Sequence, residues 1–275
     1  MTSADADTRT IWAGDAAFSY LDVGNGPQLI LLHGIGSAAA SFRYQVETLS
    51  PQLRVIAWDA PGYGASTRLA TEHPDASHYV AALDSWLGAL RIDCCHMLGH
   101  SLGTLIAARF AAEQPKRVIS LTLASIASGH GRLRPAERQR LLVQRLDDLS
   151  ELGAHGMAAK RGPRLLGPEA TKPTRRRVVE IMSRIHPDGY AQAAHMLSTG
   201  DITTDLARLP VGLPIQVIVG EADVITPPAV NLELAAACPA ASIHVIPGAG
   251  HALYLEKPQQ FNRLLADFVT AHAVA

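Results

Sequence analysis

The chain has 275 residues, 48% hydrophobic and 18% charged, which is enough apolar material for a large buried core and too little charge for disorder. Its 24 basic and 25 acidic residues give a formal net charge of −1, so no general field attracts nucleic acid or an anionic membrane. The length fits one α/β core domain that carries an insertion.

The first part of the chain predicts the edge of a sheet. Residues 1–7 are polar and acidic, without the basic start and apolar run of a secretion signal. Residues 10–23 then alternate apolar and polar side chains and end in Gly24-Asn-Gly-Pro27, which predicts an antiparallel hairpin at a sheet edge. Apolar runs and helical patterns alternate after this point, as is typical of a mostly parallel sheet with helices on both faces.

The predicted elements follow this alternation. Six apolar runs are expected to form neighbouring parallel strands, at 28–32, 54–58, 95–98, 118–123, 215–219 and 242–246. Helical patterns lie at 38–50, 78–91, 102–114, 227–237 and 258–272. Between 127 and 206 the alternation stops, and the sequence becomes arginine-rich and helical in character. We predict a helical cap at 127–206, inserted into a core formed by 1–126 and 207–275.

The expected cap differs from the core in charge. Residues 127–200 hold 13 basic and 7 acidic side chains, a net of +6, whereas the rest of the chain holds 11 and 18, a net of −7. Solvated helix faces, including Arg175-Arg-Arg177, would explain this charge. A lid that favours anionic substrates is the alternative explanation.

Cysteine usage and the absence of metal motifs limit the chemistry. Cys94, Cys95 and Cys238 cannot form a fully paired disulfide framework, and no C-x-x-C or H-E-x-x-H motif is present to hold zinc. Cys94 and Cys95 are expected to be small hydrophobic residues at the entry to a buried strand. No run of 18 apolar residues occurs either. We therefore expect a cytoplasmic protein that uses no cofactor and no metal.

A candidate nucleophile lies between a predicted strand and a predicted helix. Gly99-His-Ser-Leu-Gly103 matches the pattern G-x-S-x-G, directly after the apolar run 95–98. A sharp turn there would strain the serine and expose its hydroxyl, while the two glycines avoid collisions with the neighbouring strand and helix. We predict Ser101 as the nucleophile. The backbone N–H of Leu102, at the helix N-terminus, would face a developing oxyanion.

A serine nucleophile needs a base, and the base needs an acid that orients it. The run 215–219 leads into Gly220-Glu-Ala-Asp223, and the run 242–246 leads into Pro247-Gly-Ala-Gly-His251. Because parallel strands end at the same edge of a sheet, these side chains can converge on the serine, and their order along the chain is the one expected for this arrangement. We predict His251 as the base and Asp223 as the acid, with Glu221 as a rival carboxylate.

Two further loops follow predicted strands. His33-Gly-Ile-Gly-Ser37 follows the run 28–32, and the N–H of Ile35 is expected to be the second oxyanion donor, with Gly36 as a near rival. His33 itself is expected to be structural. Asp59-Ala-Pro-Gly-Tyr-Gly-Ala-Ser66 is interpreted as a tight turn.

Together these segments resemble the α/β-hydrolase superfamily over about 28–125 and 206–272. The resemblance implies an eight-stranded sheet and acyl transfer through Ser101, and the serine argues against dehalogenases and epoxide hydrolases, which carry an aspartate there. The chain is similar to bacterial enol-lactonases and meta-cleavage product hydrolases of aromatic-compound catabolism. The latter usually have a more glycine-rich loop and an asparagine before the serine, where this chain has Ile35 and His100.

These observations lead to one main expectation and two alternatives. We predict a serine-dependent hydrolase of a small ester, lactone or related carbonyl substrate, with a carboxylate on the substrate as the option that the cap charge suggests. A carbon–carbon bond hydrolase of ring-fission products is the first alternative. A slow-turnover ligand-sensing receptor is an alternative from another class. The expected partner is a small-molecule substrate, without nucleic acid or membrane, and a homodimer is left open.

Overall fold

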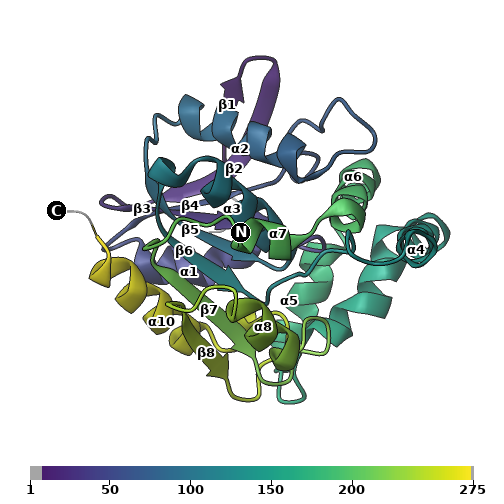
Figure 1. The fold of residues 1–275 in the computed structure, drawn as a ribbon. Coiled ribbons are helices and arrows are strands. Elements are labelled where there is room, and N and C mark those ends of the chain that lie inside the picture. The colour runs from purple at the N-terminus through teal and green to yellow at the C-terminus, as the bar shows by residue number, and fades with distance from the viewer. Residues whose placement is uncertain (1–7, 274–275) are drawn as a thin grey trace.

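The structure is a computed structural model that describes residues 8–273. One eight-stranded sheet runs through the molecule in the order β1-β2-β4-β3-β5-β6-β7-β8 (Figure 1). Residues 1–7, on which the expectation about a secretion signal rests, lie outside the described part. The strands are β1 (Thr8–Ala13), β2 (Ala16–Val23), β3 (Gln28–Leu32), β4 (Arg54–Trp58), β5 (Cys95–His100), β6 (Val118–Ala124), β7 (Ile215–Gly220) and β8 (Ser242–Ile246).

The six predicted parallel strands are the six strands from β4 to β8 in the sheet, and every neighbouring pair among them is parallel. β1 and β2 form the predicted antiparallel hairpin at the edge of the sheet. Its turn lies at Gly14-Asp15, where Gly14 has a φ of 60°, a left-handed conformation that glycine adopts without strain. The fold is therefore the mostly parallel, eight-stranded α/β arrangement that the sequence predicts.

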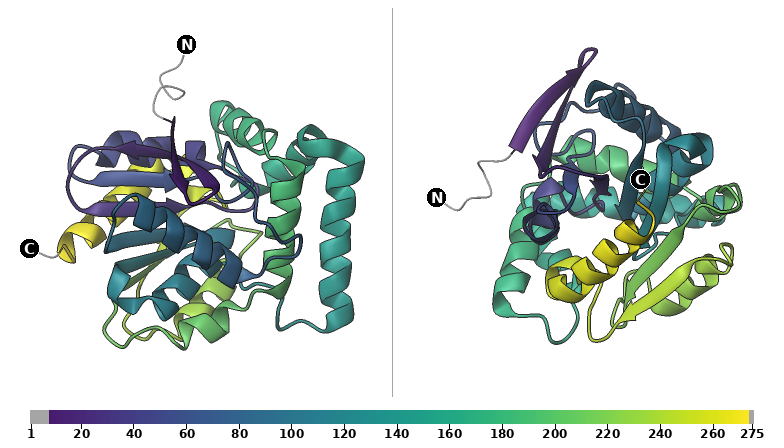
Figure 2. Two further views of the ribbon diagram at one scale, coloured as in Figure 1. Left: turned by 90° about the horizontal axis from the view of Figure 1, so that it is seen from above. Right: turned by 90° about the vertical axis from the view of Figure 1, so that its left-hand side faces the viewer.

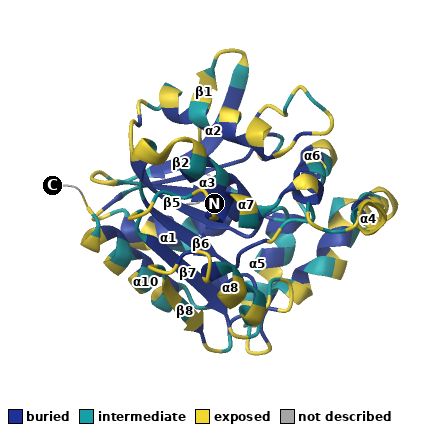
Figure 3. Cartoon of the chain, viewed as in Figure 1, coloured by how far each residue is buried: buried dark blue, intermediate teal, exposed yellow. Residues whose placement is uncertain are grey.

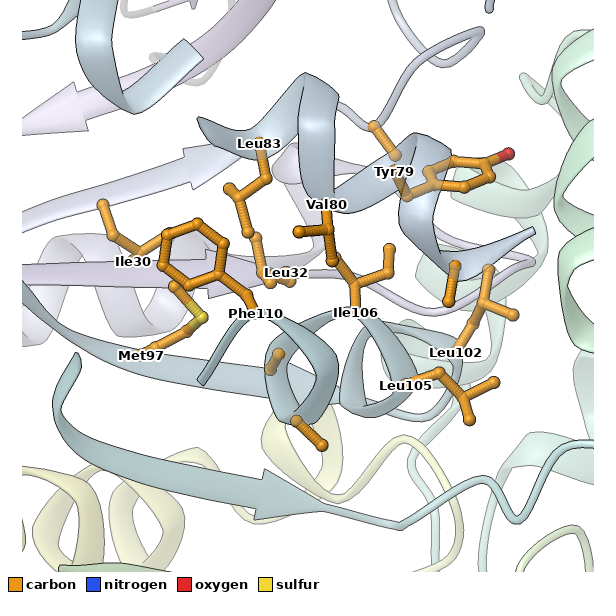
Figure 4. Packing of buried hydrophobic residues seen from close by; sticks show 14 of the residues in the cluster. Ile30, Leu32, Tyr79, Val80, Leu83, Met97, Leu102, Leu105, Ile106 and Phe110 are labelled. Carbon is orange, nitrogen blue, oxygen red and sulfur yellow. The ribbon is translucent and has the colours of Figure 1, made fainter. Parts of the chain in front are cut away.

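Helices cover both faces of the sheet (Figure 2), because alternate strand residues point to opposite sides. Ile30 and Leu32 pack with α2, α3 and α8, as Figure 4 shows for the first two helices, and Leu29 and Leu31 pack with α1, α9 and α10. The buried residues lie along the sheet and the inner helix faces (Figure 3). These helices are α1 (Arg43–Leu49), α2 (Ala76–Ala89), α3 (Leu102–Glu113), α8 (Pro228–Ala235), α9 (Leu253–Glu256) and α10 (Pro258–Ala271).

Four more helices lie between β6 and β7 and stand beside the core (Figure 2). They are α4 (Pro135–Arg161), α5 (Lys172–Met182), α6 (Pro187–Thr199) and α7 (Ile202–Leu206), and we refer to residues 135–206 as the helical layer. α4 is kinked at Gly153, whose φ of 60° and ψ of 179° are not helical. That this layer is a separate cap domain with boundaries at 127 and 206 stays a prediction.

Some local features differ from the sequence expectations. A short 3₁₀ helix, Ala39–Phe42, occupies the start of the predicted helix 38–50, and two others lie at Pro115–Arg117 and Gly162–Leu165. α9 was not expected, because four residues are too few to show a helical period. Cys95 is buried at the start of β5, but Cys94 is exposed, so its expected burial is wrong. Cys94 precedes Cys95, the first residue of β5 that pairs with β6.

Within residues 8–273, no helix combines the length and the apolar character that crossing a bilayer requires. The segment after β4 is the structural turn that the sequence predicts. Asp59 accepts hydrogen bonds from the Ser19 hydroxyl at 2.7 Å and from the Ala39 backbone N–H at 2.8 Å. This carboxylate therefore ties the edge hairpin to the loop after β3.

Candidate active site

Ser101 lies at the sharp turn between β5 and α3. Its φ of 52° and ψ of −118° are rare for a residue with a side chain, and such strain is common at functional sites. A Cβ at Gly99 would collide with the Gly103 carbonyl, and one at Gly103 would collide with the carbonyl of Leu32. The two glycines therefore let the turn pack closely between the strand and the helix.

Backbone hydrogen bonds hold this turn in place. The Ser101 N–H donates to the Ala124 carbonyl on β6 at 3.0 Å, and the Ser101 carbonyl accepts from the Thr104 N–H at 2.9 Å and from its hydroxyl at 2.6 Å. The Ser101 side chain is left to face a cavity of about 550 Å³. A serine held in this way can present its hydroxyl to a small molecule in the cavity.

His251 and Asp223 meet at the same end of the sheet, after β8 and β7. His251 Nδ1 lies 2.8 Å from Asp223 Oδ2, and both residues are buried. Oδ1 of Asp223 accepts from the N–H groups of Ile225 and Thr226, at 2.8 and 2.9 Å, and Oδ2 accepts from the Thr226 hydroxyl at 2.9 Å. The carboxylate is thus fully satisfied by donors.

These donors determine the ionisation of Asp223. Burial by itself raises the pKa of this carboxyl, but the hydrogen bonds and charge of His251, together with the bonds from Thr226, outweigh burial and leave the pKa at about 2. Asp223 is therefore ionised at neutral pH. An ionised carboxylate accepts the Nδ1 proton of the imidazole, which leaves Nε2 of His251 as a proton acceptor.

The structure brings Ser101 and His251 to one cavity, whose wall both residues help to form. The ring of His100, the residue before Ser101, lies 4.9 Å from the His251 ring, measured between centroids. Among residues 8–273 no hydrogen bond joins the Ser101 hydroxyl to the imidazole. In free enzymes such bonds are often long and shorten only when substrate binds.

Neither the rival carboxylate Glu221 nor Ser125, the residue that follows strand β6, holds the imidazole by a side-chain bond. Glu221 is exposed and accepts from the Gly248 N–H at 2.9 Å, so its carboxylate secures the loop before His251 and does not contact the imidazole. Ser125, at the end of β6, has its hydroxyl 3.5 Å from the His251 carbonyl and carries no charge. Asp223 is the only one of the three that bonds to the imidazole.

The predicted oxyanion donors flank Ser101. Leu102 is the first residue of α3, and a Cβ at Gly34 would lie 3.0 Å from the Ser101 Cβ, so the loop after β3 packs directly against the serine. Ile35 lines the cavity, and its carbonyl accepts from the Tyr63 hydroxyl at 2.8 Å. The roles of the Ile35 and Leu102 N–H groups as oxyanion donors stay predictions.

His33 supports the loop that carries Ile35, as the sequence suggests. Its Nδ1 lies 2.8 Å from the Gly34 carbonyl, and its Nε2 accepts from the Ala60 N–H at 3.0 Å. Burial lowers the pKa of His33, so the ring is neutral and matches these two bonds as donor and acceptor.

The sequence did not indicate two residues that hold His251. His100 Nε2 donates to the His251 carbonyl at 2.9 Å, and burial, together with the nearby His251, lowers the pKa of His100 to about 3. Glu256 accepts from the Gly250 N–H and from the Gly167 N–H, both at 2.8 Å. Glu256 therefore links the His251 loop to the segment between α4 and α5.

His100 stands inside the serine motif, and its position there is the only sequence feature that could have indicated a role. Glu256 gives no such indication, because a carboxylate five residues after a histidine is common on any helix surface. In the described range, 8–273, no group of three His, Cys, Asp or Glu side chains could hold a metal ion.

The fold and site together define a class of protein. The crystal structure of the enol-lactonase from Burkholderia xenovorans LB400 superposes with a TM-score of 0.86, covering 95% of this chain and all of that chain at 22% identity. At this identity the likeness shows a shared fold. The architecture is that of an α/β-hydrolase.

Sequence comparison identifies the family to which the chain belongs. The profile of the alpha/beta hydrolase family matches residues 29–264, and the chain therefore belongs to this family. It is 29% identical to the pimeloyl-[acyl-carrier protein] methyl ester esterase of Chromobacterium violaceum, covering 91% of this chain and 97% of the relative. It is also 28% identical to the 2-hydroxy-6-oxononadienedioate/2-hydroxy-6-oxononatrienedioate hydrolase 2 of Pseudomonas putida, covering 93% and 92%. The chain is an enzyme of the hydrolase class.

Proposed function

We propose that this chain hydrolyses a small ester or lactone through an acyl-enzyme on Ser101, with His251 as the base and Asp223 as the acid that orients it. The observation that carries the proposal is the 2.8 Å contact of His251 Nδ1 with Asp223 Oδ2, beside the cavity to which the strained Ser101 turn also belongs. The Chromobacterium violaceum relative is named as a methyl ester esterase, which supports an ester as substrate.

The first half-reaction forms the acyl-enzyme. His251 Nε2 takes the hydroxyl proton of Ser101 while Oγ bonds to the substrate carbonyl carbon. Negative charge develops on the carbonyl oxygen, where the N–H groups of Ile35 and Leu102 would donate. As this intermediate collapses, the bond from carbon to the alcohol oxygen breaks, and His251 gives its proton to that oxygen.

The second half-reaction releases the acid. A water molecule gives a proton to His251 Nε2, and its oxygen bonds to the acyl carbon. Collapse then breaks the bond to Ser101 Oγ, which takes the proton back. Asp223 stays ionised throughout, and its negative charge stabilises the imidazolium that forms in each half.

The test compares the wild type with Ser101→Ala for hydrolysis of 4-nitrophenyl acetate and butyrate. Because the nucleophile is lost, we expect kcat to fall by a factor on the order of 10⁴. Ser85→Ala is the matched control, since Ser85 is an exposed serine on α2 that does not line the cavity, and this variant should retain the wild-type rate. Phenylmethylsulfonyl fluoride should sulfonylate the wild type and the control, with loss of fluoride, but not Ser101→Ala. Mass spectrometry of the intact proteins would show the adduct. Equal rates in wild type and Ser101→Ala would contradict the proposal.

A second candidate is hydrolysis of a carbon–carbon bond in a dienone-type ring-fission product. The observation that favours it is the similarity to the Pseudomonas putida hydrolase, whose name gives substrates of this type. Such substrates are coloured, so their cleavage can be followed by loss of absorbance. Cleavage much faster than ester hydrolysis by the same preparation would favour this candidate over the ester or lactone.

The receptor alternative makes a kinetic prediction. A ligand-sensing protein would retain the three side chains but turn over slowly. Multiple turnover of an ester, lactone or ring-fission substrate at about 1 s⁻¹ or faster lies in the usual range for enzymes and would exclude a mainly sensory role.

A further inference from the structure

The cavity wall carries positive charge without negative charge. Three arginines, Arg145, Arg161 and Arg164, line it, and within residues 8–273 no aspartate or glutamate does. All three belong to the helical layer and lie within residues 127–200, the basic segment with a net charge of +6. The question is which of these guanidinium groups is available to a ligand.

Two of the three are poor candidates. Arg161 forms an ion pair with Asp148, which Lys160 also contacts at 2.7 Å, so its guanidinium already has a carboxylate partner. Arg164 is exposed, and water screens its charge. Some of the other basic side chains of the helical layer have structural partners too. Arg175, for example, donates to the carbonyls of Gly167, Pro168 and Ala170.

Arg145 is different. It is half-buried on α4, and among residues 8–273 no carboxylate lies within ion-pair distance of it. Its Nη1 donates to the Tyr190 hydroxyl at 2.8 Å, and Tyr190, on α6, also lines the cavity. Partial burial takes hydration away from a guanidinium, and without a counter-ion this loss is unfavourable in free energy. A bound anion would offset that free energy.

Tyr190 adds a second donor at the same place. Its hydroxyl accepts the bond from Arg145, and in the described part of the chain the hydroxyl proton has no acceptor of its own. The remaining N–H groups of Arg145 and the O–H of Tyr190 therefore lie next to each other at the cavity wall, and none of them has an acceptor among residues 8–273. Two adjacent donors match the two oxygens of a carboxylate.

We propose that Arg145 and Tyr190 form a carboxylate-binding subsite, so that the preferred substrate is an ester or lactone that carries a free carboxylate away from the scissile bond. The inference rests on the proposed function, because Ser101 and this subsite share one cavity. A single available guanidinium and one hydroxyl suit a monoanionic carboxylate better than a phosphate, which would need more donors. Of the two explanations for the basic residues at 127–200, a solvated surface or attraction of an anionic substrate, the second thus applies to Arg145. Arg161 and Arg175 fit neither explanation, because they pair with Asp148 and with backbone carbonyls.

The experiment uses two matched probes, mono-4-nitrophenyl adipate and the same ester with a terminal carboxamide in place of the carboxylate. They share a leaving group and length, so the ratio of their kcat/KM values reports recognition of the charge. We expect the wild type to prefer the adipate. Arg145→Gln should lower this ratio by about 10- to 100-fold, mainly through KM, because a charged hydrogen-bonding partner is lost. Tyr190→Phe should lower it by a smaller factor.

Arg140→Gln is the matched control, because Arg140 is an exposed arginine on α4 that does not line the cavity. It should keep the wild-type ratio. A second measurement avoids turnover of the anionic probe: free adipate should inhibit hydrolysis of 4-nitrophenyl butyrate competitively, and more weakly in Arg145→Gln than in the wild type. Melting temperatures of all variants show whether each is folded.

The two proposals fail in different ways. Ester hydrolysis that persists in Ser101→Ala would overturn the proposed function. Hydrolysis that depends on Ser101, but with no wild-type preference for the adipate probe, would overturn the subsite alone. An unchanged ratio in Arg145→Gln, or an equal change in Arg140→Gln, would also overturn it.

Discussion

The two walls of the cavity are built in different ways. On the core side, the polar side chains lie at strand ends and are held by several short bonds, as Asp223 is by Ile225, Thr226 and His251. On the helical-layer side, the wall is largely apolar, with residues such as Leu141, Val178 and Leu197. Of the charged groups there, Arg161 pairs with Asp148, Arg164 is exposed, and Arg145 is half-buried without a carboxylate partner among residues 8–273.

This contrast separates chemistry from recognition. A parallel sheet ends at one edge, so side chains that follow its strands converge with little freedom, which is what proton transfer requires. Residues of the helical layer that line the cavity can be substituted without displacing the strand ends. We infer that the core side sets the type of reaction and the helical layer selects the substrate.

The largest expected effect is on the core side. Asp223→Asn should lower kcat for 4-nitrophenyl butyrate by about 10⁴, because the amide no longer holds the imidazole in the required tautomer. Glu221→Gln, which changes a carboxylate on the same loop, should remain close to wild type, since Glu221 bonds to Gly248 and not to the ring. Steady-state kinetics of the two variants give the comparison. Similar losses in both would mean that the loop, and not the acid, matters.

The next effect is on stability. The folded-state pKa of Asp223, about 2, lies below its ordinary value of 3.8, so the ionised group stabilises the fold above about pH 4, and this contribution is lost as the pH falls towards 2. The shift corresponds to about 2 kcal/mol. In urea unfolding, the stability of the wild type relative to Asp223→Asn should therefore decrease by this amount from about pH 5 to pH 2. If the difference in unfolding free energy between the wild type and Asp223→Asn did not change with pH, the lowered pKa of Asp223 would be contradicted.

A smaller effect is expected where the two walls join. Glu256 accepts from Gly250 on the core side and from Gly167 on the other side, and both glycines are buried. In Glu256→Gln the amide can accept from one N–H but turns a donor towards the other, which leaves a buried donor unsatisfied. We expect kcat to fall about tenfold with a small change in KM, and the melting temperature to fall as well.

Glu169→Gln is the control for this junction. Glu169 is exposed and pairs with Lys257 at 3.4 Å, so it links the same two regions through solvent-exposed groups, which contribute little. Its kcat should match the wild type. If Glu256→Gln lowered the melting temperature but left kcat unchanged, Glu256 would have a structural role only, and the helical layer would not help to position His251.

Sequence patterns predicted most of the fold because buried strands appear as apolar runs, and helices of several turns show a regular spacing of apolar residues. The run Leu29–Leu32 is wholly buried, and the segment around Ser101 combines a strand end, two glycines and a helix start. α9 was missed because four residues carry no period. Cys94 was misplaced because adjacent residues at a strand entry can differ completely in exposure.

By itself, the sequence determined the eight-stranded α/β fold, and it predicted Ser101, Asp223 and His251 as the catalytic side chains because each of them follows an apolar run that ends at the common sheet edge. Only the tertiary structure decided which charges face the cavity and which residues hold His251. In the sequence, Arg145 cannot be distinguished from the other arginines of its segment, and only the fold shows that Arg161 has a carboxylate partner whereas Arg145 bonds to a tyrosine hydroxyl. Glu256 likewise bonds to residues 6 and 89 positions away in the chain. Such contacts depend on packing between distant segments, for which a linear pattern holds no information.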